Sequence, residues 1–203
     1  MKIIHEPTYS FVILTFALII VDTLLAWLAT YLFPVILPSV PGSFGISFLD
    51  FSVAFMILFT LWFGAYGAIA AYAGTLIGSG LLSSGLLTNH PLVVACWSVT
   101  ILLQVLIPLI AFRLLKVNTG LENRRDLFHL ILFGVIINNL IGVAWGSFTL
   151  LSGGIVQSGE AFGVFEVWLL GDIVITLLLL PFMVWRFTPF IRKSKLFVRN
   201  YWD

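Results

Sequence analysis

Residues 165–184 read FEVWLLGDIVITLLLLPFMV, and this stretch decides the class of fold. A helix of about 20 residues crosses the hydrocarbon core of a bilayer, which is about 30 Å thick. The only charged residues in the stretch are Glu166 and Asp172. A carboxylate at the centre of a membrane helix costs about 2.5–3.5 kcal/mol on insertion scales. Helices that carry such a group normally turn it toward a polar partner or a wet cavity, so we expect Asp172 to face the inside of a bundle.

The composition of the whole chain supports a membrane setting for this stretch. Of the 203 residues, 61% are hydrophobic and 9% are charged, and the mean hydropathy is +1.13. Soluble domains carry about 25% charged residues, so we expect a multi-pass protein of the cell (cytoplasmic) membrane, in contact with membrane lipid. The net charge is +1 and no basic stripe lies away from the predicted membrane edges, which argues against nucleic acid as a partner.

Six apolar runs alternate with polar or Gly- and Pro-rich segments, which predicts an all-α bundle of about six transmembrane helices in a single domain. The first run is too long for the apolar part of a signal peptide, so we expect it to be retained. Residues 38–47, PSVPGSFGIS, read as a loop or re-entrant turn, and Asp50 after them suits a helix start. The predicted spans are Tyr9–Phe33, Phe48–Phe63, Gly64–Leu82, Pro91–Leu115, Leu127–Leu151 and Phe165–Trp185, followed by a basic tail over Arg186–Asp203.

The basic residues give the predicted orientation of these spans. Lys and Arg occur at the amino terminus, around the connection between the fourth and fifth spans, and in the tail. The connections between the first and second, third and fourth, and fifth and sixth spans contain none. Cytoplasmic segments carry the excess of Lys and Arg in membrane proteins. Both termini are therefore predicted to be cytoplasmic.

Polar side chains near the middle of four spans are the candidate ligand-binding residues. At about 1.5 Å per residue, Asp22 and Asn139 lie about 18–20 Å from the inner ends of their spans. Gln104 and Asp172 lie about 20 Å and about 10 Å from the outer ends of theirs. We therefore expect a polar cavity that is open to the outside and admits a small molecule. The candidate set is Asp22, Gln104, Asn138, Asn139, Trp168 and Asp172, with Trp145 as a second possible wall.

These polar residues also have a purely structural interpretation, because hydrogen bonds between membrane helices are common and average about 0.6 kcal/mol. The third predicted span is rich in small residues, which let helix backbones approach closely. Two interpretations stay open for them: packing inside the bundle, or a docking face for a partner subunit. The small residues at helical spacing are Gly67, Ala70, Ala71, Gly74 and Gly78.

Sequence signatures of catalysis are missing from the chain. It contains no HExxH, GxSxG or phosphate-loop motif and no Cys or His spacing typical of a metal site. His90 and His129 fall at opposite membrane faces on the predicted topology, so they do not form a pair. We therefore predict no catalytic residue, no metal, no cofactor and no enzyme activity, although intramembrane carboxylates can carry protons in transporters.

The string WLLGD at 168–172, with Pro181 nine residues after its Asp, resembles the membrane-associated sensor domains of the MASE type. The small-residue stretch FGAYGAIAAYAGTLIGSGLL, the basic loop after the fourth span and the Gly-rich SGGIVQSG fit the order of that family, so the resemblance covers about Phe48–Phe187. It carries over Trp168, Gly171, Asp172 and Pro181 as a structural or ligand-sensing signature. It implies a sensor that passes ligand binding to a membrane or cytoplasmic partner protein.

A second resemblance rests on six spans in about 200 residues and on the run LWFGAYGAIAAYAG at 61–74. This pattern is similar to the substrate-capture components of energy-coupling-factor transporters. It implies capture of a small metabolite from outside and docking of small-residue faces on a coupling subunit. We expect the sensor type first, the transporter component second, and a structural or assembly subunit third.

Overall fold

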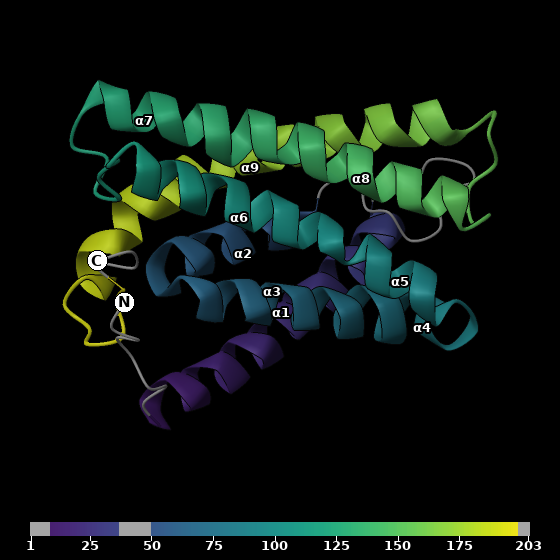
Figure 1. Cartoon of the computed structure of the whole chain (residues 1–203), viewed down its shortest axis with the longest axis horizontal. Coiled ribbons are helices and arrows are strands. Elements are labelled where there is room, and N and C mark those ends of the chain that lie inside the picture. The colour runs from purple at the N-terminus through teal and green to yellow at the C-terminus, as the bar shows by residue number, and fades with distance from the viewer. Residues whose placement is uncertain (1–8, 37–49, 199–203) are drawn as a thin grey trace.

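The computed structural model describes residues 9–36 and 50–198, which fold into a bundle of helices (Figure 1). No strand occurs among these residues, so the predicted all-α class is confirmed. The predicted loop over residues 38–47 lies outside the described residues. The elements are α1 (Tyr9–Ile36), α2 (Phe51–Phe63), α3 (Ala65–Thr75), the π-helix η1 (Leu76–Ser83), α4 (Leu86–Asn89), α5 (Pro91–Trp97), α6 (Val99–Leu114), α7 (Arg124–Ile131), the π-helix η2 (Leu132–Ile137), α8 (Asn138–Ser152) and α9 (Ala161–Ile191).

Five helical segments of the described chain are long and apolar enough to cross a membrane, as expected for a multi-pass membrane protein. They are Tyr9–Tyr31, Ala65–Ser83, Pro91–Leu114, Arg124–Ser152 and Ala161–Ile191. The remaining predicted span is represented by α2, which is apolar but has only 13 residues and is about 20 Å long. Asp50 caps its first turn, because its Oδ1 accepts a hydrogen bond from the Ser52 backbone N–H at 3.0 Å. The predicted helix start at Asp50 is therefore correct.

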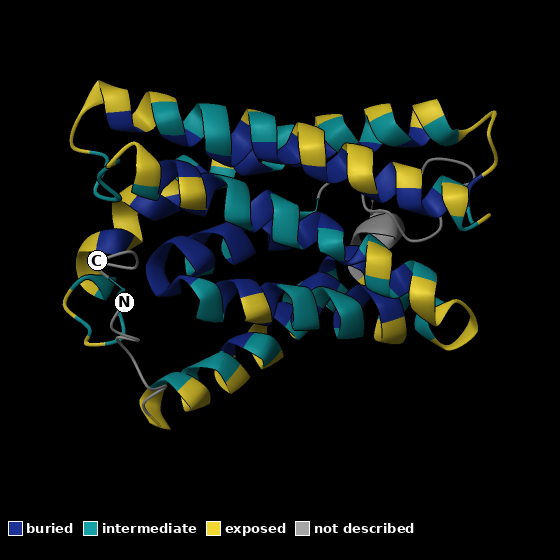
Figure 2. Ribbon diagram, in the orientation of Figure 1, coloured by how far each residue is buried: buried dark blue, intermediate teal, exposed yellow. Residues whose placement is uncertain are grey.

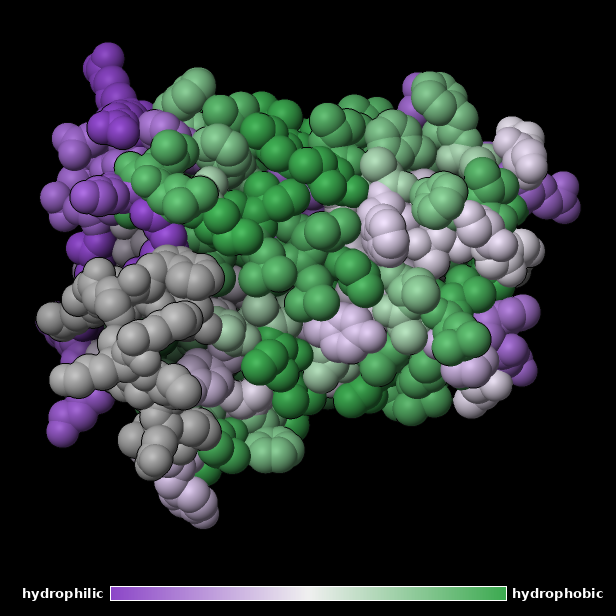
Figure 3. Space-filling view, in the orientation of Figure 1, coloured by the Kyte–Doolittle hydropathy of each residue, from purple (hydrophilic) through white to green (hydrophobic). Residues whose placement is uncertain are grey.

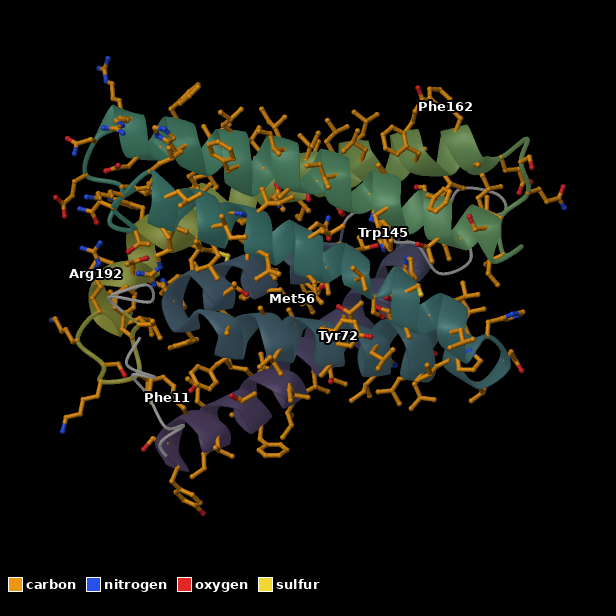
Figure 4. All side chains as sticks on the ribbon, viewed as in Figure 1. Phe11, Met56, Tyr72, Trp145, Phe162 and Arg192 are labelled. Carbon is orange, nitrogen blue, oxygen red and sulfur yellow. The ribbon has the colours of Figure 1, made fainter. Side chains whose placement is uncertain are left out.

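The two ends of the bundle differ in charge. The start of α1, the connection from α6 to α7 and the residues after α9 lie at one end, with Arg192 among them (Figures 1 and 4). We call it the basic end. The turn around α4 and the connection from α8 to α9 lie at the opposite end. Figure 3 shows polar residues at both ends with an apolar band between them, as a bilayer requires.

The core of the bundle is centred on α2, which is dark blue along most of its length in Figure 2. Met56, Ile57 and Leu58 are at most 1% exposed, and Met56 lies near the middle of the bundle (Figure 4). By contrast α1 is peripheral, and its first half is mostly exposed or half-buried (Figure 2). A helix surrounded on all sides is held by many neighbours, whereas α1 depends on its contact with α2, α3 and η1.

The small residues of α3 and η1 allow close packing against α1 on one face and against α2 on another. A Cβ atom added at Gly67 would lie 2.6 Å from the Phe59 backbone of α2. At Gly74 it would lie 2.5 Å from the Asp22 Cβ, and at Gly78 2.5 Å from the Thr23 carbonyl oxygen. Ala70 and Ala71 are fully buried as well. All five small residues are thus packed inside the bundle, and a partner could reach the three glycines only if α1 or α2 moved away.

Candidate functional site

Gln104 of α6 joins two other helices through its side-chain amide. Its Nε2 donates hydrogen bonds to Asn139 Oδ1 on α8 at 2.9 Å and to Asp172 Oδ2 on α9 at 2.8 Å. All three side chains are at most 1% exposed. In an apolar interior each such group needs a partner, because an unpaired buried polar group is costly. Both amide hydrogens of Gln104 are used in this way, which fixes the orientation of its side chain.

Two more residues complete this arrangement. Asn139 Nδ2 donates to Thr176 Oγ1 at 2.9 Å and to the Val135 carbonyl oxygen at 2.8 Å, and Thr176 Oγ1 donates to the Asp172 carbonyl oxygen at 2.5 Å. Asn138 Nδ2 reaches the Gln104 carbonyl oxygen at 3.2 Å. We call Gln104, Asn138, Asn139, Asp172 and Thr176 the polar cluster.

Consecutive asparagines can both be buried because α8 packs between α6 and α9. Successive residues of an α-helix point about 100° apart, so Asn138 meets α6 while Asn139 meets Thr176 of α9. The π-helix η2 ends immediately before them, at Ile137. π-helical turns are frequent at functional sites, because the extra residue shifts the register of the side chains that follow.

Two glycines of α8 provide the space for the site. A Cβ at Gly142 would lie 2.4 Å from Gln104 Cγ, and one at Gly146 would lie 2.5 Å from the Trp168 ring and 2.7 Å from Thr100 Oγ1. Any larger residue would therefore displace Gln104 or Trp168. Neither glycine was among the predicted site residues, although their spacing of four in GVAWG is the signal of a close helix contact.

A small cavity of about 30 Å³ adjoins the polar cluster. This volume is the share of about one water molecule in the liquid. Six helical elements (α2, α3, η1, α5, α6 and α9) and the cap residue of α2 contribute to its walls, which include a pair of tryptophans. Its lining residues are Asp50, Ser52, Val53, Thr75, Ser79, Trp97, Thr100, Ile101, Gln104 and Trp168.

The tryptophan pair consists of Trp97 and Trp168, whose ring centroids are 6.3 Å apart with an interplanar angle of 47°. Trp168 is 6% exposed and belongs to the predicted set. Trp145, the other expected wall, is instead exposed, and its indole N–H donates to the Cys96 carbonyl oxygen at 2.9 Å. Trp97 takes the place expected for Trp145, because it faces inward from the end of α5.

Several buried polar atoms beside the cavity have no hydrogen-bond partner within the described chain. These atoms are Thr100 Oγ1 and Trp97 Nε1 of two residues that line the cavity, and Asp172 Oδ1 of the residue that is hydrogen-bonded to the lining Gln104. Asp50 lines the cavity, and Asp172 adjoins it through the hydrogen bond that it accepts from the lining residue Gln104. The cavity and its immediate surroundings therefore contain two carboxyl groups, a threonine hydroxyl and an indole N–H. Asp172 was among the predicted site residues. Asp50, Thr100 and Trp97 were not, because depth along one helix does not show which residues of other helices face it.

Asp22 lies apart from this site, contrary to the expected shared cavity. It is fully buried between α1 and α3 against Gly74, and neither of its carboxylate oxygens has a hydrogen-bond partner. Position along α1 predicts how deep Asp22 lies but not which helices it faces. Because α1 is peripheral, it packs on α3 and not on α6 or α9. Asp22 therefore belongs to the contact between α1 and α3, although it lies at a similar depth to Asp172.

A second cavity, of about 430 Å³, lies at the basic end of the bundle, away from the polar cluster. Arg113 of α6 donates to the Val198 carbonyl oxygen at 2.8 Å, and Arg192 donates to Thr119 Oγ1 at 3.0 Å and also to Asn118 Oδ1. These bonds hold the segment after α9 against the connection from α6 to α7. The walls are Leu61, Leu109, Phe112, Arg113, Thr119, Arg192, Phe197 and Val198.

Comparison with protein-family models, with curated proteins and with solved structures found no match for this chain. The resemblances to sensor domains and to transporter components therefore stay predictions. Within the described residues, no group of three or more His, Cys, Asp or Glu side chains could hold a metal ion. What the site offers is a hydrogen-bonding network with two carboxyl groups inside an apolar bundle.

Proposed function

We propose that this protein is an integral membrane binding module of the sensor type, which takes up a small molecule beside the polar cluster and passes the event to a partner protein. The observation that carries this proposal is the set of buried polar atoms without partners, Asp172 Oδ1, Thr100 Oγ1 and Trp97 Nε1, next to a cavity. A polar network that served only to join helices would leave few such atoms, because each one is costly in an apolar interior.

The arrangement of the walls supports coupling between ligand binding and helix position. Asp50 is at the start of α2, Ser79 is in η1, Gln104 is in α6 and Trp168 is in α9. A molecule that contacts all four elements would favour one relative position of these helices over another. A ligand shifts a conformational equilibrium only through such a difference in contacts between the two states.

A substrate-capture component of an energy-coupling-factor-type transporter is the second candidate function. The position of the polar cluster supports it, because Gln104 and Asp172 are about 20 Å and about 17 Å from the ends of α5 and α9 that lie opposite the basic end. A small metabolite that enters from that side would reach the site without crossing the whole membrane. A structural or assembly subunit is the third candidate, and the proposal includes no catalytic step.

Gentle purification from native membranes, followed by mass spectrometry of everything that co-purifies, tests these candidates. A signalling protein together with a bound metabolite supports the sensor type. A transmembrane coupling subunit with ATPases supports the transporter component instead. A partner without any ligand supports the assembly subunit, and a lone, empty protein contradicts all three.

The Asp172→Asn variant tests the site itself, because it keeps the size of the side chain and removes its charge. We expect metabolite retention to fall at least tenfold while the protein still folds. Unchanged retention in a folded Asp172→Asn protein would contradict the proposed site.

A further inference from the structure

We infer that the cavity at the basic end binds a phosphate group that is joined to an apolar portion, as in an anionic phospholipid or a soluble phosphate ester. This cavity is separate from the polar cluster, so the inference goes beyond the proposed function and does not rest on it. It comes from three features of the cavity: its size, the two guanidinium groups in its walls, and its apolar surface.

The cavity is large enough for a small organic ligand. Its volume is about 430 Å³, and ligand pockets usually have about 300–1,000 Å³. Its walls come from the ends of α2 and α6, the connection from α6 to α7, the cap residue of α9 and the segment after α9. The two arginines also have a purely structural interpretation, which is to join the connection to this segment. That role alone would not require a cavity of this size.

Arg113 and Arg192 place two positive charges in the walls of the cavity, and no Asp or Glu is among its described lining residues. Hydrogen bonds hold both guanidinium groups in place, because Arg113 Nη2 donates to the Val198 carbonyl oxygen and Arg192 Nη2 donates to Thr119 Oγ1. One exposed carboxylate, that of Glu122, lies 3.9 Å from Arg192 Nη1. The planar fork of N–H groups in arginine matches the oxygens of a phosphate. A bound phosphate would therefore complement both charges.

The surroundings of the cavity favour an anion that carries phosphate. At the basic end, residues 113–126 and 192–195 contain seven Lys or Arg and two Asp or Glu, and such an excess attracts anions. This end is also one edge of the apolar band in Figure 3, where the phosphates of the lipid headgroups lie. Basic pockets between membrane helices on the cytoplasmic side, which is the predicted side of the basic end, bind anionic headgroups.

The remaining walls are mostly apolar, which is why the phosphate should carry an organic group. Leu109, Phe112 and Arg113 are three and four residues apart on α6, so their side chains lie close together on the surface of the helix. Leu109 lies about 6 Å deeper in the bundle than Arg113, so the apolar wall begins beneath the charge. Leu61 of α2 and Phe197 extend this apolar surface. An acyl chain or an aryl group would contact these walls, whereas inorganic phosphate would not.

Native mass spectrometry of the purified full-length protein, titrated with short-chain probes, tests the inference. Dihexanoyl phosphatidic acid carries a phosphate on an apolar group, and dihexanoylglycerol is its neutral match. Phenyl phosphate is a water-soluble ester, and inorganic phosphate has no apolar group. We expect saturable binding of at least one of the two esters, about tenfold tighter than that of dihexanoylglycerol and of inorganic phosphate. Binding of phosphatidic acid alone would identify a lipid as the ligand, and binding of phenyl phosphate alone would identify a soluble ester.

Matched variants assign the binding to this cavity. Arg113→Gln and Arg192→Gln should each weaken binding of the tighter ester about tenfold, because each removes one charge from the walls. Lys195→Gln is the control, since it removes an exposed charge at the same end from a residue that does not line the cavity. Glu122→Gln should tighten binding about twofold, because it removes the carboxylate beside Arg192. If Arg113→Gln fails to fold, Arg192→Gln and Glu122→Gln carry the test.

Several results would overturn the inference. Binding of dihexanoylglycerol as tight as that of its phosphate would show that only apolar contacts act in the cavity, and equally tight binding of inorganic phosphate would show that the apolar walls are not used. Equal losses in Lys195→Gln and in the two arginine variants would indicate attraction by the whole basic end. A lack of binding by every phosphate probe would leave Arg113 and Arg192 with their structural role alone. None of these results concerns the polar cluster, so the proposed function would stand.

Discussion

Asp172 and Asp22 are both fully buried carboxylates in an apolar bundle, yet their surroundings differ completely. Asp172 accepts a hydrogen bond from Gln104, which in turn binds Asn139 of a third helix. Asp22 has no hydrogen-bond partner on either oxygen and faces a glycine across a close contact. The comparison teaches that burial of a charged residue in a membrane does not by itself identify a site. The neighbouring helices decide whether the group is part of a network.

The largest effect should come from the contact beside Asp22. In Gly74→Val the new Cβ would lie 2.5 Å from the Asp22 Cβ and 2.9 Å from the Asp22 backbone carbon, which cannot move aside. We expect α1 to separate from α3, with a loss of about 3 kcal/mol or more in the free energy of unfolding. Unfolding in mixed detergent micelles measures this loss. A stable Gly74→Val protein would show that the contact between α1 and α3 is loose.

The second effect concerns the polar cluster. Gln104→Leu removes the donor for Asp172 Oδ2 and Asn139 Oδ1, and it leaves both acceptors buried without a partner. We expect a loss of about 1–3 kcal/mol in the free energy of unfolding, together with the loss of ligand binding. The measurement is the same unfolding experiment combined with mass spectrometry of the metabolite that co-purifies. Wild-type stability would mean that the cluster does not hold α6, α8 and α9 together.

The third effect should have the opposite sign. Asp22→Ala removes a buried carboxyl group that has no partner, so the cost of desolvating that group disappears. We expect the protein to become more stable by about 1 kcal/mol, because the small cavity left behind offsets part of the gain. A thermal melt detects this as a raised Tm. A lowered Tm would show that Asp22 has a partner in the membrane, such as a lipid or a second protein.

The smallest effect tests the outer part of the polar cluster. Thr176→Val removes the acceptor for Asn139 Nδ2 and keeps the shape of the side chain. Asn139 retains its bond to the Val135 carbonyl oxygen. The variant also loses the bond from Thr176 Oγ1 to the Asp172 carbonyl oxygen one turn earlier, but such local bonds within a helix contribute little to stability. We expect a loss of about 0.6 kcal/mol in the free energy of unfolding and little change in ligand binding. A large loss of binding would place Thr176 in direct contact with the ligand.

Much of the fold was predictable because each span carries its own signal in length and hydropathy. The helix start at Asp50 and the all-α bundle agree with the structure. The second span was predicted from Phe48, whereas α2 begins at Phe51, because Asp50 caps its first turn. Hydropathy alone does not distinguish such a short buried helix from one that crosses the whole bilayer.

The site was only partly predictable, since depth along a helix is readable from sequence and facing is not. Depth grouped Gln104, Asn139 and Asp172, which the structure brings into one hydrogen-bonded network. Depth also grouped Asp22 with them, and there it failed because α1 is peripheral. Trp97 was missed because a tryptophan near a span end usually lies at the membrane interface.

The short helix α2 connects the cavity with the opposite side of the molecule as a rigid rod. Asp50 and Ser52 at its start line the cavity, while at its end the Trp62 carbonyl oxygen accepts a bond of 2.9 Å from the Val198 N–H and the Trp62 indole donates to Thr188 Oγ1 at 3.0 Å. Because an α-helix is stiff along its axis, a displacement of about 1 Å at Asp50 would reach Trp62 almost undiminished and exceed the tolerance of about 0.5 Å that these bonds allow. If a bound molecule moved Asp50, the hydrogen bonds of Trp62 with Val198 and Thr188, about 20 Å away, would therefore have to rearrange.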